Sequence, residues 1–188
     1  MAGQTDDLIQ RLAGRTVLVI GDLMVDHFLI GNVDRISPEA PVPVVRFQNE
    51  EFPLGGACNV ANNISALGGR TVVVGVVGDD QEGRQLWRDL TSRGIGVDGI
   101  VTDAGRSTTR KARVVTTRNQ QVARIDYESD QEVAQAVESA IVERLESLIP
   151  DADVVVISDY LKGAISRTVA AASIQAANRA KRPMLIDP

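Results

Sequence analysis

The stretch from residue 55 to residue 69 combines paired glycines, an amide side chain and an apolar helical pattern. Gly55-Gly56 would let the backbone come close to a ligand, because glycine has no Cβ in the way. The N–H groups that follow would open a helix whose dipole favours electron-rich groups. Gly68-Gly69 ends this helix, and its apolar face carries Val60, Ala61, Ile64 and Leu67. The stretch predicts a small-ligand site, although a glycine pair before a helix is also an ordinary turn.

Carboxylates follow three of the expected strands, at the points where the strands end. Asp22 and Asp26 follow the first strand, Asp79 and Asp80 the second, and Asp159 a later one. Ligands of parallel sheets lie outside the carboxyl ends of the strands, and a carboxylate can accept hydrogen bonds from two neighbouring hydroxyls. A polyhydroxylated ligand would suit this edge, and we expect Asp26 to contact it. Asp79 and Asp80 are expected to cap a helix, while Asp159 fits either a ligand contact or a turn.

Cations alternate along a β-rich segment near the middle of the chain. Lys111 and Arg113 are two residues apart, so a strand would point both side chains to the same side. Arg124 lies on the strand that would return from the hairpin. Lys111 and Arg113 could reach an anionic group such as a sugar phosphate. Solvated cations that protect a sheet edge are the simpler interpretation of the same pattern.

Short β-branched runs alternate with helical patterns along the chain. Strands are predicted at residues 16–21, 70–77, 153–158 and 184–186. Helices are predicted after the glycine pair, between 79 and 94, from a cap at Ser129 or Asp130 to Pro150, and up to about Lys181. The helix between 79 and 94 is expected to group Leu86, Trp87 and Leu90 on one side. This βαβ series indicates an α/β layered fold with a mainly parallel sheet.

Two segments interrupt this alternation. Residues 27–48 show no helical period and carry three prolines before Val44, which suggests an extended, edge-like segment. Residues 108–127 are β-rich, with Arg118-Asn119 as the predicted turn of a hairpin. Together they predict a small antiparallel flap inserted into the α/β body. Such a flap could cover a ligand as a lid or form the interface of a homodimer.

The composition argues against several classes of function. The chain has 188 residues, 44% of them hydrophobic and 24% charged, which indicates a globular protein with a sizeable core. A net charge of −5 gives no general electrostatic reason to bind nucleic acid or an anionic membrane. One histidine, His27, and one cysteine, Cys58, argue against a metal site, and we expect a structural role for His27. Neither a signal peptide nor a membrane span is evident, so we expect a cytoplasmic protein.

Two motifs of the sequence belong together. The first is Gly21-Asp22-x-Met24-x-Asp26, and the second is Gly55-Gly56-Ala57-x-Asn59-x-Ala61, which runs on to Leu67-Gly68. Both resemble the sugar-binding signature of the ribokinase-like, or PfkB-type, carbohydrate kinases. Residues 35–44, 118–121 and 158–163 are similar to one branch of this family, the kinases of D-glycero-β-D-manno-heptose 7-phosphate. The resemblance extends from about residue 16 to residue 188.

The resemblance implies a Rossmann-like α/β body with a β lid, and phosphorylation of the anomeric hydroxyl of this sugar phosphate by ATP with Mg²⁺. It implies that the sugar hydroxyls contact Asp26, Gly55, Gly56 and Asn59. The side chains expected to bind the substrate phosphate are those of Lys111, Arg113 and Lys162. Asp159 stays a substrate-binding candidate beside Lys162.

One part of the family's pattern is missing from the sequence. The Gly-Ala-Gly-Asp loop, which in the family forms the anion hole and supplies the catalytic aspartate, does not occur before Pro188. We therefore expect residues 1–188 to be the N-terminal portion of one kinase domain, without its ATP-binding half and inactive alone. A non-catalytic sugar-phosphate-binding or dimerising module is the alternative. An oxidoreductase fits poorly, because no Gly-x-Gly-x-x-Gly follows the first strand.

Overall fold

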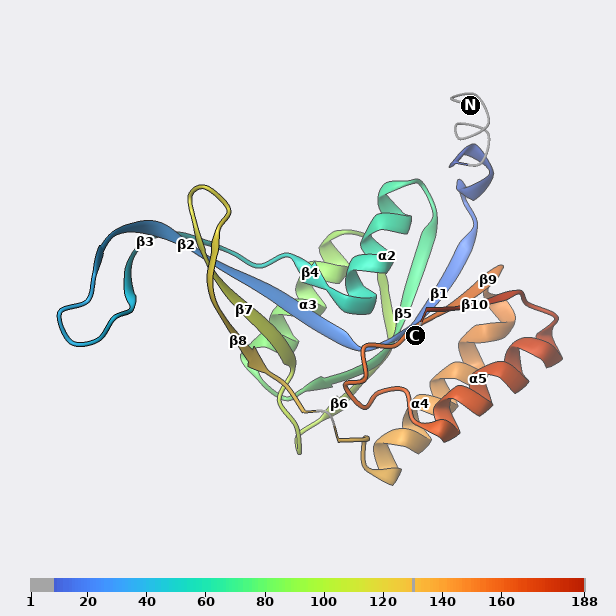
Figure 1. The fold of residues 1–188 in the computed structure, drawn as a ribbon. Helices are drawn as coiled ribbons and strands as arrows, with labels where there is room; N and C mark the ends of the chain where they lie inside the picture. Colours follow the sequence, from blue (N-terminus) through green and yellow to red (C-terminus); the bar gives the residue numbers. More distant parts are fainter. Residues whose placement is uncertain (1–8, 130, 188) are drawn as a thin grey trace.

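Two β-sheets form the framework of the chain (Figure 1). The computed structural model describes residues 9–129 and 131–187. Sheet A is wholly parallel and has the strand order β10-β9-β1-β5-β6. Its strands are β1 (Thr16–Gly21), β5 (Arg70–Gly78), β6 (Gly96–Asp103), β9 (Val154–Ser158) and β10 (Met184–Asp187). The expected parallel sheet is confirmed, and β6 is a strand that the sequence pattern did not predict.

Helices cover both faces of sheet A (Figure 1). One face carries α2 (Gly56–Ala66) and α3 (Gln81–Ser92), and the other carries α4 (Gln135–Leu148), the short 3-10 helix η1 (Ile149–Asp151) and α5 (Arg167–Ala180). Strand β1 supplies both cores, because alternate side chains of a strand point to opposite faces. Leu18 and Ile20 pack with α4 and α5, whereas Val17 and Val19 pack with α2 and α3. In the described part of the chain, the helices are too short or too polar to cross a membrane.

Sheet B is built mainly from the two segments expected to form the lid, residues 27–48 and 108–127, and it extends away from sheet A (Figure 1). Its strands are β2 (Leu23–Ile36), β3 (Pro43–Glu51), β7 (Thr109–Thr116) and β8 (Gln121–Tyr127), in the order β3-β2-β7-β8, with β4 (Leu54–Gly55) paired to the start of β2. The expected antiparallel pairing is found between β2 and β3 and between β7 and β8, whereas β2 and β7 pair in parallel. Both strands leave the carboxyl edge of sheet A, after β1 and after β6, and therefore run in the same direction.

Most predicted turns and helix faces form in the structure. Gly68 has a φ of 92° and ends α2 in the left-handed conformation that glycine tolerates. Asn119 has a φ of 58° in the turn between β7 and β8. Leu86 and Leu90 are buried under α3 as expected, but Trp87 is 46% exposed and does not join their face.

Helix α4 begins later than the predicted cap at Ser129. Its N-cap is Ala134, which offers no side-chain hydrogen bond. The backbone N–H of Val133 donates to the carbonyl of Gly163 at 3.1 Å, so the residues before α4 join the loop after β9 instead of the helix. The alternative cap, Asp130, lies outside the described residues.

Candidate functional site

One face of sheet B collects the charged side chains that stood out in the sequence. The register places Lys111 of β7 between Asp26 of β2 and Asp126 of β8. Two pairs further along, Arg113 of β7 lies opposite Arg124 of β8. Paired residues share a face of a sheet, and so do residues two apart along a strand. Lys111 and Arg113 therefore point to the same side, as their alternation predicted, and Asp26 lies beside them.

Asp26 lies where this charged face meets the glycine pair. Its carboxylate forms an ion pair with the Arg113 guanidinium, and each of the two side chains is 24% exposed. A Cβ on Gly55 would lie 3.1 Å from Asp26 Oδ2 and 2.9 Å from Met24 Cγ. Gly56 has a φ of 49°, a conformation that other residues rarely adopt. The glycines thus allow the start of α2 to pack closely on β2, a reason separate from the ligand approach expected from the sequence.

The first turn of α2 holds one exposed and one buried side chain next to the glycines. Asn59 is exposed, so its amide is accessible to a ligand. The Cys58 side chain is fully buried, and this burial raises the pKa of the thiol to about 12, although backbone hydrogen bonds act to lower the pKa. The thiol is therefore neutral near pH 7 and a poor nucleophile.

The loop that follows β9 carries Asp159 and Lys162. Leu161 N donates to Asp159 Oδ1 at 2.8 Å, so the structure shows Asp159 in the turn that was one of its two expected uses. Lys162 Nζ donates to Glu128 Oε1 at 2.9 Å, and these side chains are only 17% and 23% exposed. Because Glu128 is two residues beyond Asp126, this ion pair brings Lys162 to the charged end of sheet B.

Asp22 fixes this loop, a role that the sequence did not predict. Its side chain follows β1 and is almost fully buried. Asp22 Oδ2 accepts hydrogen bonds from Tyr160 N at 2.8 Å and Lys162 N at 3.1 Å, and Oδ1 accepts one from Ala164 N at 3.2 Å. The only signal in the sequence is the position of Asp22 directly after a buried strand.

Asp80 has the expected capping role and a second role at the base of the lid. It is the N-cap of α3, where Asp80 Oδ1 accepts from Gly83 N at 2.8 Å. Its carboxylate also accepts from the N–H and the hydroxyl of Thr108, both at 2.7 Å. Partial burial acts to raise the Asp80 pKa, but the hydrogen bonds from Thr108 and Gly83 outweigh it and hold the pKa below its ordinary value. Asp79 is not a cap; it pairs with Arg84 on the surface.

The single histidine has the structural role expected of it. The His27 ring stacks on Phe52 with centroids 4.2 Å apart, and His27 Nε2 lies 2.9 Å from Glu50 Oε2. Within residues 9–129 and 131–187, no three His, Cys, Asp or Glu side chains are grouped so that they could hold a metal ion.

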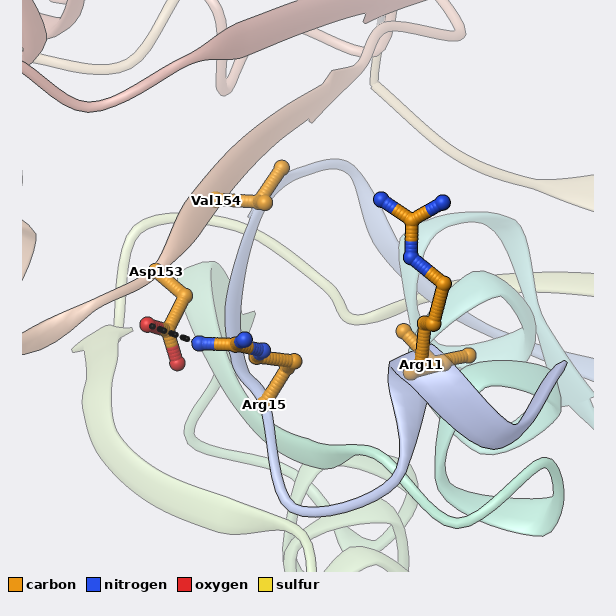
Figure 2. Close-up of a pocket in the computed structure, with 5 residues that line it drawn as sticks. Arg11, Arg15, Asp153 and Val154 are labelled. Atoms are coloured by element: carbon orange, nitrogen blue, oxygen red, sulfur yellow. Dashed lines mark ion pairs between the residues drawn. The ribbon is translucent and has the colours of Figure 1, made fainter. Parts of the chain in front are cut away.

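A hollow of about 460 Å³ lies at the end of sheet A that is opposite to the carboxyl ends of its strands (Figure 2). It is lined by Arg11, Leu12, Arg15, Asp153 and Val154, and Arg15 Nη1 lies 3.5 Å from Asp153 Oδ1. This hollow adjoins the amino ends of β1 and β9, whereas ligands of parallel sheets bind at the carboxyl ends. A second hollow, of about 400 Å³, is lined by residues 105–107 and 126–129 and adjoins the charged face at Asp126. We therefore take the charged face of sheet B, and not the hollow of Figure 2, as the candidate site.

The sequence matches the profile of the pfkB family carbohydrate kinases over residues 15–188. Similar curated proteins include the "Bifunctional protein HldE" of Bradyrhizobium diazoefficiens, which is 42% identical over 97% of this chain and 37% of the relative. The proteins of the same name from Caulobacter sp. (strain K31) and Geobacter sulfurreducens are both 45% identical, over 97% of this chain and 38% and 37% of their own length. The chain thus spans well under half the length of these relatives.

Solved structures of similar fold include a putative phosphofructokinase from Staphylococcus aureus, with a TM-score of 0.71 at 13% identity, covering 92% of this chain and 53% of that one. The ribokinase of Arabidopsis thaliana, complexed with ribose and ATP, has a TM-score of 0.63 at 15% identity and coverages of 93% and 54%. At these identities, the likeness shows a shared fold.

Proposed function

Because the chain belongs to the pfkB family of carbohydrate kinases, we propose that the charged face of sheet B, beside the start of α2, binds a phosphorylated sugar as the acceptor of a phosphoryl group from ATP. The observation that carries this proposal is the Asp26 carboxylate, which lies between the glycine pair and a group of cations. The substrate we propose is D-glycero-β-D-manno-heptose 7-phosphate, phosphorylated on its anomeric hydroxyl in the cytoplasm. The similarity to the HldE proteins and the segments shared with that branch support this choice.

We assign the sugar hydroxyls to the residues around the glycine pair. The Asp26 carboxylate can accept hydrogen bonds from two neighbouring hydroxyls while its other lone pairs stay on Arg113. The Gly55-Gly56 backbone and the exposed Asn59 amide lie at the same end of α2, where they would complete the hydrogen bonding of the ring. Asp159 already accepts a hydrogen bond within its turn, so its remaining oxygen would be the atom that faces the sugar.

We assign the substrate phosphate first to Lys111 and Arg113. In the part of the chain that the structure describes, Lys111 has no ion-pair partner, whereas Arg113 is shared with Asp26. Lys162 is paired with Glu128, so its binding to phosphate would have to weaken an existing contact. Lys111 could therefore bind the phosphate without giving up an existing ion pair.

We further propose that this chain supplies the sugar side of the reaction and does not transfer the phosphoryl group by itself. The sequence contains no Gly-Ala-Gly-Asp loop, and phosphoryl transfer depends on such groups to position the nucleophile and to stabilise charge. ATP and Mg²⁺ would then be held mainly by residues outside this sequence. Incubation of the chain with ATP and the heptose phosphate should give no ADP; measurable product would contradict this part of the proposal.

Calorimetric titration of the chain with the heptose 7-phosphate tests the sugar site. Asp26→Asn should weaken binding at least tenfold, or about 1.4 kcal/mol, because an amide loses one acceptor oxygen and the pairing with Arg113. Asp34→Asn is the matched control, since Asp34 also lies on β2 but pairs with Arg46 near the far end of the lid. Equal affinities of Asp26→Asn and the unaltered chain would reject the assignment.

A homodimer through the lid is a second proposal, and a specific feature favours it. Four large apolar side chains on or beside β3 are exposed to solvent. They are Ile36 (60%), Val42 (51%), Phe47 (58%) and Phe52 (43%). Exposed apolar groups that cluster on one part of a surface are typical of protein interfaces.

A further inference from the structure

The hollow at the amino ends of β1 and β9 gathers positive charge in a chain that is acidic overall (Figure 2). Arg11 lies on one side of the hollow and Arg15 on the other, beside Asp153. The hydrogen bond from Thr16 N lowers the pKa of Asp153 most, and the nearby charge of Arg182 adds to this effect. Three arginines thus lie around one carboxylate, although the whole chain has a net charge of −5.

The carboxylate of Asp153 is committed to the fold and does not balance all of these cations. Asp153 Oδ2 accepts from Thr16 N at 2.8 Å, and Asp153 N donates to Thr16 O at 2.8 Å, which joins the starts of β9 and β1. The Arg15 side chain is 63% exposed, and its pairing with Asp153 contributes little to stability for that reason. In the part of the chain that the structure describes, Arg11 makes no ion pair.

The backbone that carries Arg15 is held by hydrogen bonds on both sides. Arg15 N donates to Leu12 O at 3.0 Å, and Arg70 N donates to Arg15 O at 2.8 Å. Gly14, with a φ of 74°, turns the chain into β1, and its N–H donates to Gly68 O at 3.0 Å. The cations of the hollow therefore project from an ordered backbone, which lowers the entropic cost of binding a ligand.

A ligand that matches this hollow has at least two negative charges and an apolar part. Guanidinium groups on two sides suit a diphosphate, whose oxygens can accept hydrogen bonds from both groups at once. Leu12 and Val154 complete the lining and offer apolar surface to a ring. The volume of about 460 Å³ lies within the range of about 300–1,000 Å³ that is usual for small-molecule sites. A nucleoside diphosphate combines these features.

We propose that the hollow between Arg11 and Arg15 is a second binding site, which takes a nucleoside diphosphate with its phosphates on the two guanidiniums and its base against Leu12 and Val154. The hollow adjoins the amino ends of the strands of sheet A, whereas the charged face of sheet B lies beyond their carboxyl ends. A nucleotide in the hollow would therefore be remote from the proposed sugar site and would act as an effector, not as the phosphoryl donor.

Calorimetric titrations of the chain with ADP, inorganic pyrophosphate and adenosine test this site. Arg11→Gln and Arg15→Gln each remove one of the two cations, and both side chains are exposed, so the variants should fold. Arg144→Gln is the matched control, because it removes the same charge from the exposed side of α4. Thermal melting checks that all three variants fold.

We expect ADP to bind more tightly than pyrophosphate, because only ADP also contacts the apolar side chains, and adenosine to bind most weakly. Arg11→Gln and Arg15→Gln should each weaken ADP binding at least fivefold, and Arg144→Gln should match the unaltered chain. Binding of the heptose 7-phosphate should be unchanged in Arg11→Gln, because the sugar site is separate.

Absence of ADP binding by the unaltered chain, or equal ADP affinities of the unaltered chain, Arg11→Gln and Arg15→Gln, would overturn the proposal. Loss of ADP binding in Asp26→Asn but not in Arg11→Gln would also overturn it, since the nucleotide would then lie on the charged face of sheet B. If the chain binds ADP through Arg11 and Arg15 but does not bind the heptose 7-phosphate, the proposed function fails and the second site stands.

Discussion

The buried Asp22 carboxylate holds the loop that presents Lys162. Hydrogen bonds to a charged acceptor contribute about 1.5–3 kcal/mol each in favourable cases, and Asp22 accepts three from backbone N–H groups. In Asp22→Asn, the new amide N–H₂ would face backbone donors. We expect the free energy of unfolding to fall by about 2–4 kcal/mol in urea denaturation. Asp98→Asn, an exposed control on β6, should change the free energy of unfolding by less than about 0.5 kcal/mol. An equally small change in Asp22→Asn would contradict the proposed role of Asp22 in holding the loop.

Some site residues could be predicted from local sequence and others could not. Asp26 stood out because it follows a buried strand, and Lys111 with Arg113 because a period of two assigns them to one face. The partners of Asp22 lie 138 to 142 residues away in the sequence, and no local pattern encodes such a contact. The pairing of Lys162 with Glu128 has the same origin, because only the folded sheet brings β8 and the loop after β9 together.

At the scale of elements, the contact between α3 and β7 fixes the start of the lid. Asp80 caps α3 and at the same time binds Thr108, directly before the strand that carries Lys111. Asp80→Ala should lower the free energy of unfolding at pH 7 by about 1–2 kcal/mol, as loss of a helix cap does. Asp79→Ala is the control, since Asp79 is exposed and makes no cap.

The loss of stability in Asp80→Ala should depend on pH, because the pKa of Asp80 is lowered in the folded chain. A lowered folded-state pKa stabilises the fold above the unfolded-state pKa of about 3.9, and this contribution is lost as the pH falls through the lower folded-state pKa. The difference in the free energy of unfolding between the unaltered chain and Asp80→Ala should therefore become smaller as the pH is lowered from 5 to the most acidic pH at which the chain still folds. Urea denaturation at several pH values measures it, and a gap independent of pH would refute the ionic contribution.

The elements that the sequence did not predict have physical reasons. Strand β6 reads GVDGIVTD, and its two glycines and two aspartates give it a low β-propensity; its pairing with β5 provides the stability that its composition lacks. The parallel pairing of β2 with β7 depends on where both strands leave sheet A, which is a property of the topology. The hairpin of β7 and β8 was predictable, because a turn sequence between two β-rich runs is local.

At the scale of the whole molecule, two apolar surfaces compete as sites of self-association. One is the exposed group on the lid, which includes Phe47, and the other is the edge strand β10, where Leu185 is 64% and Ile186 55% exposed. An unpaired strand edge can also join two chains. The two surfaces lie on different sheets (Figure 1), so single substitutions can separate them.

Phe47→Glu should shift the chain from dimer to monomer in sedimentation velocity, because a carboxylate cannot be buried unpaired in an apolar interface without a large cost. Ile186→Glu places the same charge on the edge of sheet A and should leave the dimer intact. If Ile186→Glu dissociates the dimer and Phe47→Glu does not, association runs through β10 and the lid proposal fails. Phe47 lies on the same sheet as the charged face that is proposed to bind the sugar. Phe47→Glu should therefore also be titrated with the heptose 7-phosphate. Unchanged affinity in the monomer would show that each chain binds its sugar without help from a second copy.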